Sequence, residues 1–166
     1  MSYHIYTTRG IVLSERPVRE ADRIYTIITR DLGLVRAMAT GVRKETSKLR
    51  GNIEPFSLAS ISFVKGKNYW RLISAELIQN IPSISLIARP LALIEKLVQG
   101  EASNPEFFDA VEKTILSSGS YDEMFESNLV SKILFHLGYL KESDMALDKK
   151  SLIKAINAGL QNSHLT

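Results

Sequence analysis

The chain has 166 residues, of which 45% are hydrophobic and 23% charged, and its formal net charge is +3 at pH 7. This composition is typical of a folded globular protein, and no apolar run approaches the roughly 18 residues that a membrane-spanning helix needs. The absence of cysteine from the sequence excludes disulfide bonds and thiolate metal sites. The first residues lack the pattern of a secretory signal, so we expect a cytoplasmic location.

The charge is divided along the chain. Residues 1–80 contain 13 Lys and Arg against 7 Asp and Glu, whereas residues 81–166 contain 8 against 11. Such a division indicates two units with different partners. We therefore predict a domain over residues 1–79 and a second domain over residues 80–166.

The first half of the chain has the patterns of β-strands. Alternation is clearest where Ala59, Ile61 and Phe63 are separated by serines. Five strands are predicted, over residues 3–14, 23–30, 34–40, 56–64 and 69–75. Five strands in about 75 residues favour a partly open barrel of the OB type. An SH3-like barrel is the structural alternative, because strand count alone does not separate the two.

The second half changes to a helical period. Asn104 and Pro105 have the pattern of an N-cap and a first helical residue, and Asp148 is a second N-cap candidate. Four helices are predicted, over residues 90–99 with a start as early as Ser83, 104–115, 122–137 and 148–160. Their apolar stripes and short connections predict a small helical bundle, and the fold class is therefore α+β.

A cationic segment lies between the third and fourth predicted strands. Residues 43–51 carry four cations against one Glu45, and we expect this polar connection on the surface. The cations are Arg43, Lys44, Lys48 and Arg50. Lysine and arginine release condensed counterions when they contact a nucleic-acid backbone, so the segment is a candidate phosphate-binding loop. The alternative is a loop that serves only solubility.

The predicted hairpin turn at residues 65–68 adds a second group of candidates. It contains Lys65 and Lys67 and leads into Tyr69, Trp70 and Arg71. Aromatic rings beside cations allow OB-folds to stack bases while pairing phosphates. Tyr69 and Trp70 point to opposite faces of a strand, so at most one of them is expected to be an exposed stacking platform.

The sequence predicts neither catalysis nor a metal site, and we expect no cofactor. It has none of the nucleotide-binding or nucleophile motifs that mark common enzymes. Its histidines, His4, His136 and His164, lack ligand spacing. The carboxylates at positions 15, 20 and 22 alternate with arginines at positions 16, 19 and 23, which favours a solvated ion-pair cluster over acid–base chemistry.

Several stretches, taken together in this order and spacing, resemble the N-terminal domain of the RecO family of bacterial recombination mediators. They are Gly10–Leu13, Arg19–Ile24, Thr29–Gly33, Ala39–Lys44, Ser47–Gly51 and Pro55–Leu58. The resemblance extends over residues 5–77. It weakens through the helices and returns at Leu134–Tyr139, which is similar to the end of a long helix in that family.

The resemblance implies an OB-fold followed by a helical domain, binding to single- and double-stranded DNA, and strand annealing without nucleotide hydrolysis. It also implies partnership with RecR and with the single-stranded-DNA-binding protein SSB in recombinase loading. Many relatives place a four-cysteine zinc module soon after the position of Tyr139, and no cysteine follows it here. We therefore expect either a minimal, zinc-free version or a shortened one.

For the helical half, the expectation is a protein-binding surface. The cations nearest to apolar helix faces are Arg89, Lys96 and Lys132, and each is a candidate contact for SSB, although an ordinary solvated side chain is the alternative. Two other functions remain open from the residues. One is an RNA-binding OB module, and the other is an adaptor whose basic loop binds an acidic peptide.

Overall fold

The computed structural model describes residues 3–82, 84–117, 122, 124–146 and 148–163. The chain forms two compact units, which are described separately below. The first comprises residues 1–82 together with 98–104, and the second comprises residues 83–97 together with 105–166. One stretch of the predicted helical half, residues 98–104, thus belongs to the first unit.

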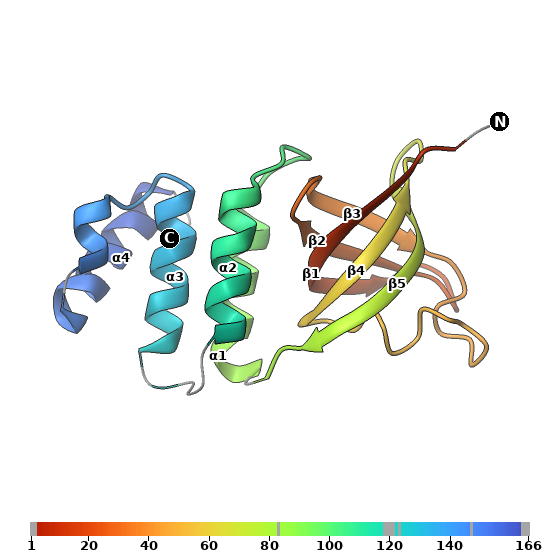
Figure 1. Ribbon diagram of the computed structural model, residues 1–166, viewed down its shortest axis with the longest axis horizontal. Coiled ribbons are helices and arrows are strands. Elements are labelled where there is room, and N and C mark those ends of the chain that lie inside the picture. Colours follow the sequence, from red (N-terminus) through yellow and green to blue (C-terminus); the bar gives the residue numbers. More distant parts are fainter. Residues whose placement is uncertain (1–2, 83, 118–121, 123, 147, 164–166) are drawn as a thin grey trace. The chain divides into compact units, whose positions relative to one another are not determined.

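The first unit is a closed five-stranded barrel (Figure 1). Its strands are β1 (Ile5–Pro17), β2 (Arg23–Thr29), β3 (Gly33–Ala39), β4 (Ser57–Val64) and β5 (Trp70–Asn80). The order around the barrel is β1-β2-β3-β5-β4, and all pairs are antiparallel except β3 with β5. This is the OB-fold, and with the helices that follow it confirms the predicted α+β class.

The long strand β1 closes the barrel by pairing with both β2 and β4. Gly10 lies where the two pairings overlap, and a Cβ atom there would come within 2.7 Å of the Ile27 side chain. A bulge follows between Val12 and Ser14, and such a bulge bends a strand and increases its twist. Glycine and bulge together allow one strand to serve two neighbours.

The barrel core contains one face of each strand. In β4 the predicted alternation is confirmed, because Ala59, Ile61 and Phe63 are fully buried while Ser60 and Ser62 are only partly buried. Alternation of this kind fixes register, since a slip of one residue would turn every apolar side chain outward.

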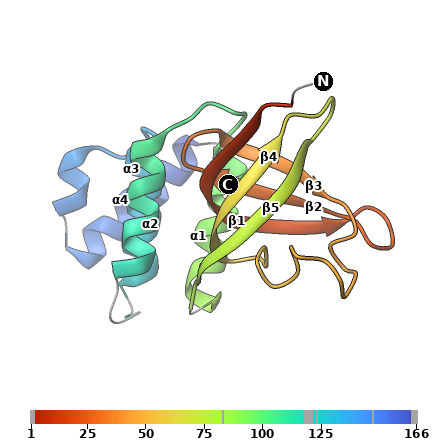
Figure 2. The same ribbon diagram turned by 45° about the vertical axis from the view of Figure 1, so that its right-hand side comes forward.

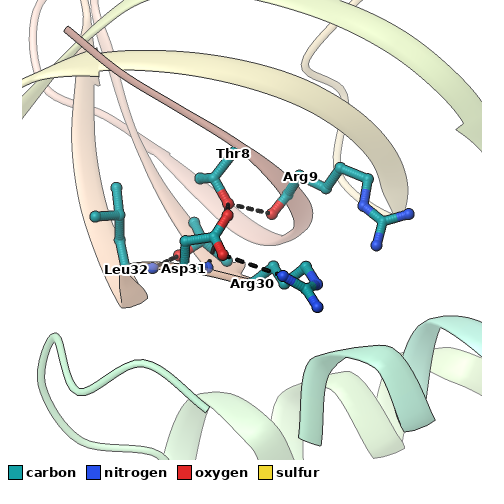
Figure 3. Close-up of polar contacts among 6 residues, drawn as sticks. Thr8, Arg9, Arg30, Asp31 and Leu32 are labelled. Atoms are coloured by element: carbon teal, nitrogen blue, oxygen red, sulfur yellow. Dashed lines mark hydrogen bonds and ion pairs between the residues drawn. The ribbon is translucent and has the colours of Figure 1, made fainter. Parts of the chain in front are cut away.

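The turn between β2 and β3 is fastened to β1 by side-chain hydrogen bonds (Figure 3). Thr8 Oγ1 donates to Asp31 Oδ2 at 2.7 Å, and it accepts from the Asp31 backbone N–H at 3.2 Å. Arg30 forms an ion pair with the other carboxylate oxygen at 3.3 Å. These bonds hold the β2–β3 hairpin against the first strand.

The second unit consists of four α-helices and a short 3-10 helix. They are α1 (Ile84–Leu97), α2 (Pro105–Ser117), α3 (Phe125–His136), η1 (Glu142–Ala146) and α4 (Lys149–Asn162). Helix α3 contacts α1, α2 and α4, and its Leu129 and Ile133 are fully buried. The predicted bundle is thus built around α3.

Two predicted helix starts have different outcomes. Asp148 is confirmed as an N-cap, since its carboxylate accepts a hydrogen bond from the Ser151 backbone N–H at 2.9 Å. Helix α1 begins at Ile84, so Pro90 lies in its interior and not near its first turn as predicted. The suggested start at Ser83 falls outside the described residues. None of the described helices is long and apolar enough to span a membrane.

Candidate nucleic-acid interface

The cationic loop is anchored in the barrel core by apolar side chains. Three apolar side chains in the connection between β3 and β4 are buried: Val42, Leu49 and Ile53, with exposed fractions of 5%, 9% and 1%. The expectation that this connection lies on the surface was therefore wrong for Leu49, which lies inside the charged stretch. These side chains pack in the same cluster as the strands, so the loop has a defined position on the barrel (Figure 2).

Hydrogen bonds fix the loop between these apolar residues. Backbone N–H groups at positions 44, 47, 50 and 52 each donate to the carbonyl three residues earlier, which makes a series of tight turns. Asn52 links the loop to β5, because its Oδ1 accepts from the Leu77 N–H at 3.2 Å while its Nδ2 donates to the Lys48 carbonyl at 3.1 Å.

The start of the loop is held by the β1–β2 connection. Asp22 is 7% exposed, and its Oδ1 accepts a hydrogen bond from the Gly41 N–H at 2.7 Å. Arg43 donates from its backbone N–H to the Ala21 carbonyl and from Nη1 to the Glu20 carbonyl, at 3.3 and 3.1 Å. Asp22 therefore has a structural role beyond its ion pair with Arg19.

All four predicted loop cations, Arg43, Lys44, Lys48 and Arg50, are exposed. Among the residues that the structure describes, none of the four forms an ion pair with a carboxylate. Arg43 and Arg50 also line a polar cleft of about 310 Å³, in which the neighbouring Arg23 is neutralised by Glu15. A fixed backbone and cations without carboxylate partners together suit contact with phosphates. No ion pair within the protein has to be broken before these side chains bind a phosphate.

Tyr25 also lines this cleft. Its side chain is 3% exposed, and burial raises the pKa of its hydroxyl, an effect that Arg23 opposes. The tyrosine therefore stays a neutral hydrogen-bonding group beside the arginines at physiological pH.

The structure places Trp70 in the core, which corrects its assignment as a DNA-binding residue. Trp70 is 5% exposed, with Tyr6 and Phe63 in edge contacts at ring-centroid distances of 5.3 and 6.1 Å. The Lys65 ammonium lies 5.3 Å from its ring centroid. A ring covered in this way offers no surface on which a base can stack. Tyr69 is only partly buried and lies in the turn just before β5.

Glu101 joins Trp70 to the hairpin turn. Its Oε1 accepts from Trp70 Nε1 at 2.8 Å, and its Oε2 accepts from Lys65 Nζ at 3.2 Å. The preceding Gly100 carbonyl accepts from the Leu34 N–H at 3.1 Å, so residues 98–104 are fixed on β3. Lys65 is thus already engaged by a carboxylate, whereas Lys67 and Arg71 have no carboxylate partner among the described residues.

Replacement of Glu101 by alanine is expected to destabilise the barrel by about 1 kcal/mol at neutral pH, because the indole N–H of Trp70 loses its acceptor. The hydrogen bond from Trp70 holds the pKa of Glu101 below its ordinary value of 4.5. Since ionised Glu101 is favoured in the folded state, the stabilisation is complete above pH 4.5 and is lost as pH falls through the lowered pKa.

Denaturant unfolding of the wild type and of Glu101→Ala, followed by the fluorescence of the single tryptophan, measures this difference at several pH values. The difference should shrink below about pH 4.5. Glu76→Gln, at an exposed position of β5, is the matched control. A cost that is equal at pH 3 and pH 7 would show that ionisation of Glu101 does not contribute to the stability of the barrel.

The sequence reasoning missed two arginines on the outer face of the barrel. Arg16 donates from Nη2 to the Tyr69 hydroxyl at 3.3 Å. Arg36 is exposed on β3, one position before Ala37, which pairs with Trp70. Arg36 and Tyr69 both line one recess of the barrel. Alternation within β3 signals that Arg36 points outward, but the parallel pairing that brings it to Tyr69 has no local sequence signal.

The three predicted partner-binding residues differ in their surroundings. Arg89 is engaged by Glu126, with Nε and Nη2 donating to the two carboxylate oxygens at 2.8 and 3.0 Å. Lys96 is exposed. Lys132 is partly buried and lines a polar cavity of about 410 Å³ formed by α2, α3 and η1.

Among the described residues, no group of three or more His, Asp or Glu side chains could hold a metal ion.

Comparison with known proteins shows which sequences this chain is similar to. Residues 1–81 match the family model described as Recombination protein O N terminal. The chain resembles RecO. A DNA repair protein RecO from Synechococcus sp. (strain JA-2-3B'a(2-13)) is 42% identical over 94 residues, which are 51% of this chain and 33% of that protein.

The similarity to RecO also continues beyond the barrel. The DNA repair protein RecO of Dehalococcoides mccartyi (strain ATCC BAA-2100 / JCM 16839 / KCTC 5957 / BAV1) is 33% identical over 141 residues, 77% of this chain and 56% of that protein. That of Heliobacterium modesticaldum (strain ATCC 51547 / Ice1) is 27% identical over 167 residues, 93% of this chain and 59% of that protein. The chain thus spans from about a third to three fifths of these relatives' length.

Proposed function

We propose that this chain is a non-enzymatic DNA-binding protein of DNA repair and recombination. In this role it anneals complementary strands and assists recombinase loading on single-stranded DNA coated by SSB. The observation that carries the proposal is the fixed cationic loop on an OB-fold: exposed cations without carboxylate partners project from a backbone that is anchored in the core. The similarity to proteins named DNA repair protein RecO supports the choice of DNA as the ligand.

The proposed binding mode combines phosphate contacts with one aromatic platform, Tyr69. The loop cations at positions 43, 44, 48 and 50, with Lys67 and Arg71, contact the backbone of the strand. Such contacts hold a strand without reading its sequence, because every nucleotide carries the same phosphate. Annealing needs binding that does not depend on base sequence, since the bases must remain free to pair with a second strand.

Parallel titrations with single-stranded DNA, duplex DNA, RNA of the same sequence and an acidic peptide test this function against its alternatives. We expect DNA to bind, with a log–log salt dependence of several units and about −0.7 per phosphate contact for the single strand. An RNA module would bind the RNA oligonucleotide more tightly than DNA, and an acidic-peptide adaptor would bind the peptide best. Binding of DNA that does not depend on salt would contradict the loop as the phosphate contact.

For protein partners, we propose that the helical unit binds the acidic C-terminal tail of SSB and that the protein also acts with RecR. Lys132 is the best placed of the predicted cations, because it stands beside a cavity, whereas Arg89 is engaged by Glu126. The SSB tail peptide should bind weakly to the full chain and lose affinity when Lys96 and Lys132 are both replaced by alanine. Peptide binding that survives this double change would exclude the site.

A further inference from the structure

A recess of about 570 Å³ lies on the barrel beside the hairpin turn. It is formed by β3, the turn between β4 and β5, and the segment 98–104, all within the first unit. The side chains that define its chemistry are Leu34, Arg36, Lys67, Asn68, Tyr69 and Glu101. The recess is distinct from the cleft beside the cationic loop, which is lined by other residues.

One part of the recess offers flat groups. Tyr69 is partly buried, and its hydroxyl is tethered by Arg16 at 3.3 Å, which limits rotation of the ring. Arg36 lines the same recess, and it forms no ion pair with a carboxylate among the described residues. An aromatic ring and a guanidinium plane are the two surfaces on which proteins stack unpaired bases.

The recess also offers polar groups that can bind the edge of a base. Hydrogen bonds from Trp70 and Lys65 lower the pKa of the Glu101 carboxyl and favour its ionised form. A carboxylate accepts hydrogen bonds from the N–H groups of a base, and Asn68 adds an amide that can both donate and accept. Lys67, which has no carboxylate partner among the described residues, can instead pair with a phosphate beside that nucleotide.

We infer that this recess holds one unpaired nucleobase of a bound strand, with Tyr69 and Arg36 as the stacking surface. The inference rests on the proposed function and deepens it, because it assigns a part of the site to bases. A base inside a duplex is paired and stacked on its neighbours, so it cannot enter without leaving the helix. The recess therefore gives the protein a preference for single strands over duplexes, which phosphate contacts alone do not provide.

The test compares two oligonucleotides of equal length and charge, one with normal bases and one in which every nucleotide is abasic. Wild-type protein should bind the normal strand about 5- to 150-fold more tightly, the range that corresponds to stacking of one base. Tyr69→Ala should remove most of this difference by weakening binding of the normal strand only, and Tyr69→Phe should restore it. Arg43→Ala should weaken binding of both strands alike.

Fluorescence of the single Trp70, which lines the recess, provides a second readout. Its emission should change on binding of the normal strand and stay constant on binding of the abasic strand. Equal affinity of the wild type for both strands would overturn the inference and leave the proposed function intact. So would an equal loss for both strands in Tyr69→Ala with unchanged thermal unfolding. Failure of the wild type to bind either strand would overturn the proposed function together with the inference.

Discussion

Alanine at all four loop cations, Arg43, Lys44, Lys48 and Arg50, is expected to weaken binding of single-stranded DNA at least about a hundredfold at 0.1 M salt. Each lost phosphate contact lowers the log–log salt slope by about 0.7, so the slope should fall by about three. The side chains are exposed, while the loop is held by Val42, Leu49 and Ile53. The variant should therefore keep its fold. Fluorescence anisotropy of a labelled oligonucleotide across a salt series measures both quantities.

The matched control removes four positive charges from the helical unit. Its changes are at the exposed residues Lys113, Lys141, Lys150 and Lys154, replaced by alanine. Because the total charge of the two variants is the same, a general attraction of a basic protein for DNA would affect them equally. If the loop cations are the phosphate contacts, only the loop variant should show a reduced log–log salt slope. Equal reductions in the two variants would contradict this assignment.

Ile53→Ala is expected to lower the free energy of unfolding by about 2–5 kcal/mol, the usual cost of removing a large buried aliphatic side chain. Ile53 is 1% exposed, and it belongs to the same core cluster as the strands of the barrel. The change tests whether the cationic loop is part of the barrel core. Urea unfolding followed by tryptophan fluorescence gives the value.

Ile73→Ala is the control for this substitution, because Ile73 lies on β5 and is 46% exposed. Surface substitutions away from special features usually change stability by less than about 0.5 kcal/mol. If Ile53→Ala were as mild as Ile73→Ala, the loop would not be anchored in the core. DNA affinity of the folded fraction of Ile53→Ala should also fall, since the loop loses the anchor that fixes its cations.

The strands and most helices could be predicted because their signals are local. Alternating burial in β4 and the cap at Asp148 each depend on a few neighbouring residues, and both are confirmed. The position of residues 98–104 could not be predicted, because it depends on long-range contacts. Glu101 bonds with Trp70, and a Cβ on Gly33 would come within 2.6 Å of the Ala102 carbonyl oxygen. Nothing near Glu101 in the sequence indicates either contact.

The candidate site could likewise be predicted only in part from the sequence. Charge density identified the loop cations, because a run of lysine and arginine is expected at the surface. Composition did not identify which aromatic residue faces outward, and it gave no reason to group Arg16 and Arg36 with Tyr69. That grouping comes from the recess that Arg36 and Tyr69 both line, beside the pairing of β3 with the start of β5, and from the hydrogen bond of Arg16 to Tyr69. Neither can be inferred from residue type.

The measurement that tests the central proposal most directly is the rate at which two complementary DNA strands pair in the presence of the protein. We predict that the wild type accelerates pairing without added nucleotide, that high salt abolishes the acceleration, and that the fourfold loop variant loses it while the helical control variant keeps it. A pairing rate that equals the rate of the strands alone, under conditions in which the protein binds both strands, would contradict the proposed annealing function.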